Sequence, residues 1–128
     1  MKTLDVFSGC GGMSLGFTKA GFALTMAVDN WGPAINTYRQ NFSHTVADLD
    51  LANFDSIEFL AGLESDVIIG GPPCQDFSIA GFRETEGKRA NLTLSFADLI
   101  SKAKPHAFVM EIAFELQIPL LIDYYIHF

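Results

Sequence analysis

The stretch Gly-Gly-Pro-Pro-Cys at 70–74 holds the residue best suited to nucleophilic chemistry in this chain. It follows the apolar run 67–69, which is typical of a short buried strand. Cys74 is one of only two cysteines. A buried cysteine usually packs as a small apolar side chain. Here two prolines fix the backbone just before the thiol, and a thiol held in one direction suits a nucleophile.

A cysteine attacks as the thiolate, which positive charge stabilises. Five of the eight basic residues follow the motif, namely Arg83, Lys88, Arg89, Lys102 and Lys104. Basic residues in this segment are equally typical of a loop and a helix face that are exposed to solvent. His44 precedes one expected strand and His106 precedes another, so both are expected at the opposite edge of a sheet. The positions of these histidines disfavour a Cys–His hydrolase.

Three acids stand where apolar runs end. Asp29 could accept the hydroxyls of a ribose, or could cap the helix that Pro33 begins. Asp48 could accept a hydrogen bond from an adenine amino group, or could be an exposed loop acid. Glu111 ends the apolar run 108–110, where a carboxylate must be paired or functional.

A glycine turn, Ser-Gly-Cys-Gly-Gly at 8–12, lies between an expected strand and an expected helix. Such a turn lets a ligand approach the backbone closely, although a tight turn that needs positive φ explains the glycines equally well. Together with Asp29 and Asp48, the turn suits a cofactor that carries adenosine.

Short apolar runs alternate with helical patterns, which predicts an α/β fold with a doubly wound, mostly parallel sheet. The expected strands are 3–7, 22–28, 45–47, 66–69 and 107–110, and the expected helices are 13–20, one from Pro33, 55–63 and one from Leu92 to Pro105. The glycine turn, the three acids and Cys74 all follow strands. They are therefore expected along one rim of the sheet.

The composition narrows the class of protein. The 128 residues suffice for one domain, and 49% hydrophobic residues argue against disorder. No apolar stretch is long enough to cross a bilayer, and the start does not resemble a secretory signal. Two cysteines in different loops indicate free thiols in a reducing cytoplasm. The net charge of −7 by itself argues against a nucleic-acid partner.

Three motifs resemble the DNA cytosine-5 methyltransferases of the prokaryotic modification type. They are DVFSGCGGMSLGF at 5–17, GGPPCQDFS at 70–78 and FVME at 108–111. The resemblance implies a Rossmann-like fold, S-adenosylmethionine (SAM) as cofactor, double-stranded DNA as partner and no metal. The residues that it implies for the cofactor site are Phe7, Gly9, Gly11, Gly12, Asp29, Asp48 and Pro72.

The resemblance also implies a mechanism on a cytosine flipped out of the duplex. Cys74 would attack C6 of the ring, and Glu111 would bond the ring at N3. The implied DNA-contacting loop supplies Gln75, Ser78, Arg83, Lys88 and Arg89.

Beyond Glu111 the resemblance ends, because Ile112 and Ala113 stand where the family has Asn-Val. We therefore expect a SAM-binding and catalytic core at 1–111 and a divergent tail at 112–128. We also expect a chain that is truncated after about five strands and inactive alone. The alternatives are a non-catalytic SAM-binding or interaction module, and a small thiol oxidoreductase, which the lack of a Cys-x-x-Cys pair disfavours.

Overall fold

The computed structural model describes residues 1–73 and 92–112, and within them five parallel strands form one sheet. The strands are β1 (Lys2–Val6), β2 (Ala23–Asp29), β3 (Thr45–Asp48), β4 (Val67–Gly70) and β5 (Ala107–Met110). The helices are α1 (Gly12–Lys19), α2 (Gly32–Asn41), α3 (Phe54–Ala61) and α4 (Leu92–Ala103). The alternation of strand and helix confirms the predicted α/β class.

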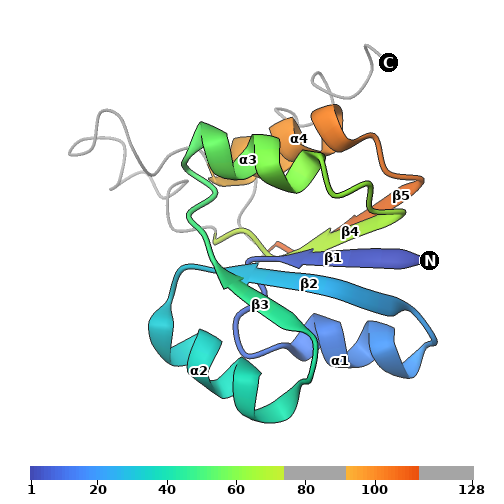
Figure 1. Ribbon diagram of the computed structural model, residues 1–128. Helices are drawn as coiled ribbons and strands as arrows, with labels where there is room; N and C mark the ends of the chain where they lie inside the picture. Colours follow the sequence, from blue (N-terminus) through green and yellow to red (C-terminus); the bar gives the residue numbers. More distant parts are fainter. Residues whose placement is uncertain (74–91, 113–128) are drawn as a thin grey trace.

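The sheet has the order β3-β2-β1-β4-β5, so the chain reverses its direction of winding between β1 and β4. Helices α1 and α2 cover one face of the sheet, and α3 and α4 cover the other (Figure 1). In a doubly wound sheet, ligands bind beyond the carboxyl ends of the strands at such a reversal. The fold therefore directs attention to the segments that follow β1 and β4.

The described residues form two hydrophobic clusters, one on each side of the sheet. Leu4 and Val6 pack with Ile68 and Phe96 in a cluster beneath α3 and α4. A smaller cluster on the α2 side contains Tyr38 and its neighbours Ala27, Ile35 and Val46. Asp5 is fully buried, although it is charged in water. Its environment is described with the site.

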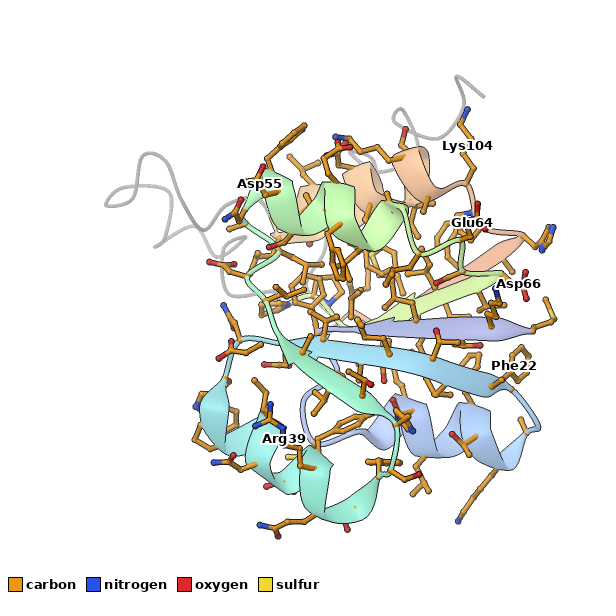
Figure 2. The ribbon with its side chains drawn as sticks, in the orientation of Figure 1. Phe22, Arg39, Asp55, Glu64, Asp66 and Lys104 are labelled. Carbon is orange, nitrogen blue, oxygen red and sulfur yellow. The ribbon has the colours of Figure 1, made fainter. Side chains whose placement is uncertain are left out.

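Two histidines lie at the amino edge of the sheet. His44 lies just before β3, and His106 lies just before β5, 3.7 Å from a carboxylate oxygen of Asp66. Figure 2 shows Asp66 at this amino edge. The predicted position of both histidines is confirmed. Within the described ranges, no helix is long and apolar enough to span a membrane.

Most predicted elements agree with the structure to within two residues at each end. The apolar runs located β5 at its observed bounds and β1 one residue late. The predicted tail lies outside the described residues except for Ile112, so its boundary at 111 stays a prediction.

Candidate functional site

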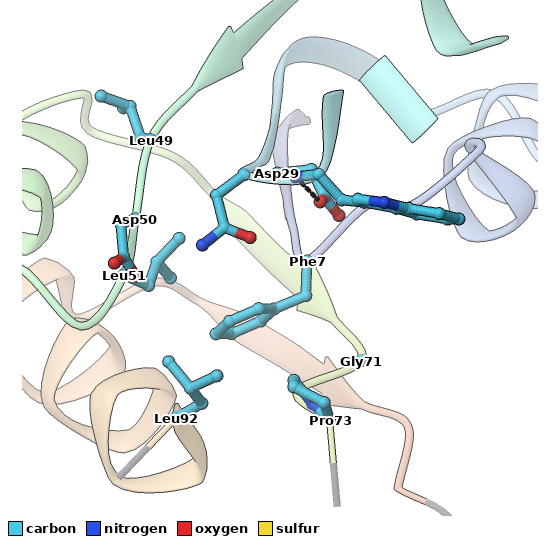
Figure 3. Close-up of a pocket in the computed structure, with 10 residues that line it drawn as sticks. Phe7, Asp29, Leu49, Asp50, Leu51, Gly71, Pro73 and Leu92 are labelled. Atoms are coloured by element: carbon cyan, nitrogen blue, oxygen red, sulfur yellow. Dashed lines mark hydrogen bonds between the residues drawn. The ribbon is translucent and has the colours of Figure 1, made fainter. Parts of the chain in front are cut away.

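A cavity of about 580 Å³ opens at the carboxyl edge of the sheet, where the strand order reverses. This volume lies within the range of roughly 300–1,000 Å³ that is common for ligand-binding pockets. The cavity is lined by Phe7, Asp29, Asn30, Trp31, Leu49, Asp50, Leu51, Gly71, Pro73 and Leu92 (Figure 3). Four segments that follow strands thus meet at one place, together with the start of α4.

The turn after β1 approaches this cavity through Phe7. Phe7 has φ of 55°, which a non-glycine residue rarely adopts, and its half-buried side chain forms part of the wall. The amide of Ser8 then donates to the carbonyl of Val28 at 3.0 Å, which ties the turn to β2. Gly9 follows with φ of 54°. A Cβ at Gly9 would meet no atom within 4 Å, so the turn is open on that side.

Gly11 has a different role from Gly9. Its φ is 95°, and a Cβ there would lie 2.3 Å from the ring of Phe42 and 2.9 Å from the ring of Tyr38. The absence of a side chain therefore lets the turn rest directly on aromatic rings of α2 and the residue after it. Gly12 begins α1 and, like Gly9, has open space where a Cβ would be.

Asp29 links two walls of the cavity. One carboxylate oxygen accepts from the amide of Gly9 at 2.8 Å. The other accepts from the amide of Trp31 at 2.8 Å (Figure 3). Each oxygen keeps a lone pair for a further donor. The residue that caps α2 is Trp31, with no side-chain cap bond. Asp29 therefore does not serve as the N-cap residue of α2.

The acid nearest the cavity after β3 is Asp50 rather than Asp48. Asp48 ends β3 and is exposed, whereas Leu49, Asp50 and Leu51 line the cavity. Asp50 also accepts a bond from the amide of Ala52 at 2.9 Å, which turns the chain toward α3. The role of Asp48 in adenine binding stays a prediction.

The segment after β4 is fixed by close contacts. A Cβ at Gly70 would lie 2.5 Å from the carbonyl oxygen of Val6, so only glycine fits beside β1. Pro72 is buried, and Pro73 is the proline that lines the cavity. Cys74 and the predicted DNA-contacting residues Gln75, Ser78, Arg83, Lys88 and Arg89 lie outside the described residues.

Glu111 lies beside this segment. Its amide donates to the carbonyl of Gly70 at 2.9 Å, and a Cβ at Gly71 would be 3.1 Å from its carboxylate. The topology thus brings Glu111 to the same edge as the glycine turn, Asp29 and Asp48. The predicted common rim is confirmed for these described residues.

A chain of hydrogen bonds runs behind the glycine turn. Burial raises the pKa of Asp5 to about 6, against bonds from Ser14 that lower it, and Asp29 raises it further. The Ser14 hydroxyl donates to Asp5 at 2.5 Å, and the Tyr38 hydroxyl donates to Ser14 at 2.6 Å. His44 meets the Tyr38 oxygen through Nε2, and burial lowers the pKa of its ring.

The sequence did not indicate several cavity residues, including Asn30, Trp31 and Asp50. Trp31 is 63% exposed, which is unusual for the single tryptophan of a chain, and its position two residues after the acid that ends β2 was the available signal. Within 1–73 and 92–112, no group of three or more His, Cys, Asp or Glu side chains could hold a metal ion.

Comparison with known proteins decides the family. The model of the C-5 cytosine-specific DNA methylases matches residues 1–115. The chain belongs to this family. The resemblance inferred from three motifs is thereby confirmed.

Relatives of this methylase chain include type II methyltransferases. M.HgiDI from Herpetosiphon aurantiacus is 57% identical over 87% of this chain, which covers 36% of that protein. M.HgiGI from the same organism is 54% identical over 87% of this chain and 89% of its own length. The chain thus spans about a third of one of these relatives and most of the other.

Solved structures give the same fold. A prophage-encoded protein from E. coli, described as a DNA modification methyltransferase, matches with a TM-score of 0.76 and 34% identity over 97% of this chain and 35% of its own. A Dnmt2 variant from Spodoptera frugiperda matches with a TM-score of 0.75 at 22% identity, over 96% and 38% of the two chains. The latter supports the fold alone.

Proposed function

We propose that this chain is the cofactor-binding and nucleophile-bearing part of a DNA cytosine-5 methyltransferase, and that SAM binds in the cavity at the carboxyl edge. The observation that carries the proposal is the family match together with a cavity at the strand-order reversal.

The lining residues fit an adenosine-bearing cofactor. Asp29 has free lone pairs beside an open glycine turn, as ribose hydroxyls require. Exposed Trp31 and half-buried Phe7 offer flat apolar surfaces for a base, and Asp50 offers an acceptor for an amino group. Phe7, Gly9, Gly11, Gly12 and Pro72 then shape or support the pocket, as the resemblance implied. Asp48 and Asp50 are alternative partners for the adenine.

SAM supplies a methyl group made electrophilic by its attachment to a positively charged sulfur. Cys74 would add as thiolate to C6 of a flipped cytosine, which would make C5 nucleophilic toward that methyl group. The methyl–sulfur bond of the cofactor would break as the methyl–C5 bond forms, and the demethylated cofactor would leave. A base then removes the C5 proton, and the sulfur–C6 bond breaks to restore the ring and the thiolate. Glu111, which adjoins the segment leading to Cys74, bonds the ring at N3 and stabilises its activated form.

The partner in this proposal is double-stranded DNA. The residues that contact it are Gln75, Ser78, Arg83, Lys88 and Arg89. These contacts act against the net charge of −7, which repels phosphate. The protein would act in the cytoplasm as the modification enzyme of a restriction–modification system. This assignment follows the type II relatives.

Cofactor binding is tested by titration with S-adenosylhomocysteine (SAH), the demethylated product of SAM. Trp31 is the single tryptophan and lines the cavity, so its fluorescence reports binding at this place. We expect saturable quenching by SAH and none by NAD⁺. Quenching by NAD⁺ alone would replace the proposal with a dinucleotide-binding function.

The nucleophile is tested by incubating the protein with SAM and DNA that carries 5-fluorocytosine, which blocks loss of the C5 substituent. Mass spectrometry should find a covalent adduct on Cys74, and Cys74→Ser should abolish it. Cys10, which is exposed, is the internal control, and iodoacetamide should label Cys74 faster than Cys10. Binding of SAH without any adduct would identify a non-catalytic SAM-binding module instead.

We expect the 128-residue polypeptide alone to transfer tritiated methyl groups to DNA poorly. Base flipping costs a few kcal/mol, which contacts with DNA must recover. The net charge of −7 repels phosphate, so this chain by itself recovers little of that cost. Robust transfer that Cys74→Ser removes would contradict this expectation and would strengthen the assignment of the nucleophile.

A further inference from the structure

The hydrogen-bond chain Asp5–Ser14–Tyr38–His44 joins β1, α1, α2 and the residue before β3. Its first three members are fully buried, and His44 is half-buried. None of the four lines the cavity. The chemistry proposed above uses none of these side chains, so the network needs an explanation of its own.

The direction of the chain follows from the donors. Burial raises the pKa of Tyr38 to about 12, so the phenol keeps its proton. The Tyr38 hydroxyl donates its one hydrogen bond to the Ser14 oxygen, and the Ser14 hydroxyl donates to a carboxylate oxygen of Asp5. His44 must then donate its Nε2 proton to the phenol oxygen. Asp5 therefore anchors one end as the acceptor, and every hydroxyl in the chain has a defined orientation.

The same tyrosine also supports the glycine turn through contact. The Tyr38 and Phe42 rings lie 4.4 Å apart between centroids, and both would collide with a Cβ on Gly11. The His44 ring lies against both of them, at 5.4 Å from Tyr38 and 5.2 Å from Phe42. Tyr38 thus contacts the glycine turn at Gly11 and donates a hydrogen bond to Ser14 in the first turn of α1.

We infer that Tyr38 is a positioning residue for the cofactor, because it holds the Gly9–Gly12 turn from behind through Ser14 and Gly11. The inference rests on the proposed binding of SAM in the cavity. Asp29 holds Gly9 from the β2 side, and Tyr38 holds Gly11 from the α2 side, so the turn is fixed at two points before a ligand arrives. Such preorganisation improves affinity, since less order has to be imposed on binding.

The test compares wild type, Tyr38→Phe and Thr37→Val in SAH titrations followed by Trp31 fluorescence. Tyr38→Phe keeps the ring but removes the hydroxyl that bonds Ser14. Thr37→Val removes a neighbouring hydroxyl that donates to the carbonyl of Pro33 within α2, so it is the matched control. We expect roughly three- to tenfold weaker SAH binding for Tyr38→Phe, as the loss of one buried hydrogen bond implies, and no change for Thr37→Val.

A merely structural role of Tyr38 is excluded by a second readout. In ¹H–¹⁵N spectra, Tyr38→Phe should shift and broaden the amide signals of Gly9, Gly11 and Gly12 while those of β4 and α4 stay in place. A general loss of stability would instead affect signals throughout the sheet. Equal SAH affinity in wild type and Tyr38→Phe, or unchanged glycine signals, would overturn the inference.

If Tyr38→Phe does not fold, His44→Phe decides in its place, because it keeps a ring beside Tyr38 and Phe42 but removes the nitrogen. We then expect about twofold to threefold weaker SAH binding, and unchanged affinity would overturn the inference. Failure of the wild type itself to bind SAH would defeat the proposed function. Wild-type binding with unaffected variants would defeat only the positioning role.

Discussion

The carboxylate of Glu111 lies against Gly71, where an added Cβ would stand 3.1 Å from Oε2. The backbone holds the same pair in register, because the Glu111 amide donates to the carbonyl of Gly70. Glu111 is thus placed relative to the segment that leads to Cys74 by two independent contacts. This pairing fixes the proposed acid relative to Gly70 and Gly71, which precede the proposed nucleophile in the sequence.

Gly70→Ala should destabilise the fold. The added Cβ would meet the carbonyl oxygen of Val6 at 2.5 Å, and neither strand can move without disturbing the sheet centre. Overpacking of this kind costs roughly 1–3 kcal/mol, and we expect the upper end here. Urea unfolding measures the loss, and a variant as stable as wild type would show that β1 and β4 can separate freely.

Gly71→Ala should leave stability within about 1 kcal/mol of wild type, because the exposed Glu111 side chain can move aside. That movement displaces the carboxylate, so covalent adduct formation on DNA should fall by about tenfold or more. The comparison is made at saturating SAM, because Gly71 also lines the cavity. A fully active Gly71→Ala would argue against Glu111 as the group that bonds the base.

The two glycines of the turn should respond differently to alanine. Gly9→Ala has open space for its methyl group and costs only the left-handed strain of roughly 1–2 kcal/mol, yet it should block close approach of SAH. Gly11→Ala adds a collision with the Phe42 ring at 2.3 Å, so its loss of stability should be larger. Thermal unfolding ranks the pair, and the reverse order would contradict the packing described at Gly11.

Asp29→Ala should weaken SAH binding by roughly ten- to a hundredfold, since hydrogen bonds to a charged group contribute about 1.5–3 kcal/mol. Part of this effect comes from the freed amides of Gly9 and Trp31.

Asp48→Ala and Asp50→Ala form a matched pair of variants that tests which acid contacts the adenine. Because Asp50 lines the cavity and Asp48 does not, we expect the larger effect at Asp50. The opposite ranking in calorimetry would restore Asp48.

Asp5 should make stability depend on pH in an unusual direction. Burial raises its pKa from 3.8 to about 6, so the folded state binds the proton more tightly than the unfolded chain does. Its contribution to stability therefore falls as the pH rises from about 4 to about 6, by on the order of 3 kcal/mol. Asp5→Asn should remove this part of the slope in urea unfolding measured across that range.

His44 acts with the opposite sign in the same measurement. Burial lowers the pKa of His44, so protonation below about pH 6.5 favours the unfolded chain. The contribution of His44 to stability therefore decreases as the pH falls. The effect of Asp5 is therefore the difference between wild type and Asp5→Asn, with surface Asp55→Asn as the control. Parallel curves for wild type and Asp5→Asn would refute the assigned shift.

The sequence predicted that the candidate site residues lie at the carboxyl edge of the sheet, because residues such as Asp29 and Glu111 directly follow apolar runs. It could not predict which side chains line the cavity, since Leu92 reaches it from a helix that is distant in sequence. Gly11 illustrates the same limit. The pattern explained it by turn geometry, whereas its contact with Phe42 depends on how α2 packs.

The central position of β1 has a consequence for the nascent polypeptide. In chain order β1 and its neighbour β2 are separated only by α1, so they can pair early in synthesis. The other neighbour of β1, β4, follows α2, β3 and α3. The glycine turn and Asp29 can therefore assemble on a half-sheet while one edge of β1 is still unpaired, a state open to strands of other molecules. SAM contacts residues from both halves in the proposed complex, so it would stabilise the finished sheet over this intermediate.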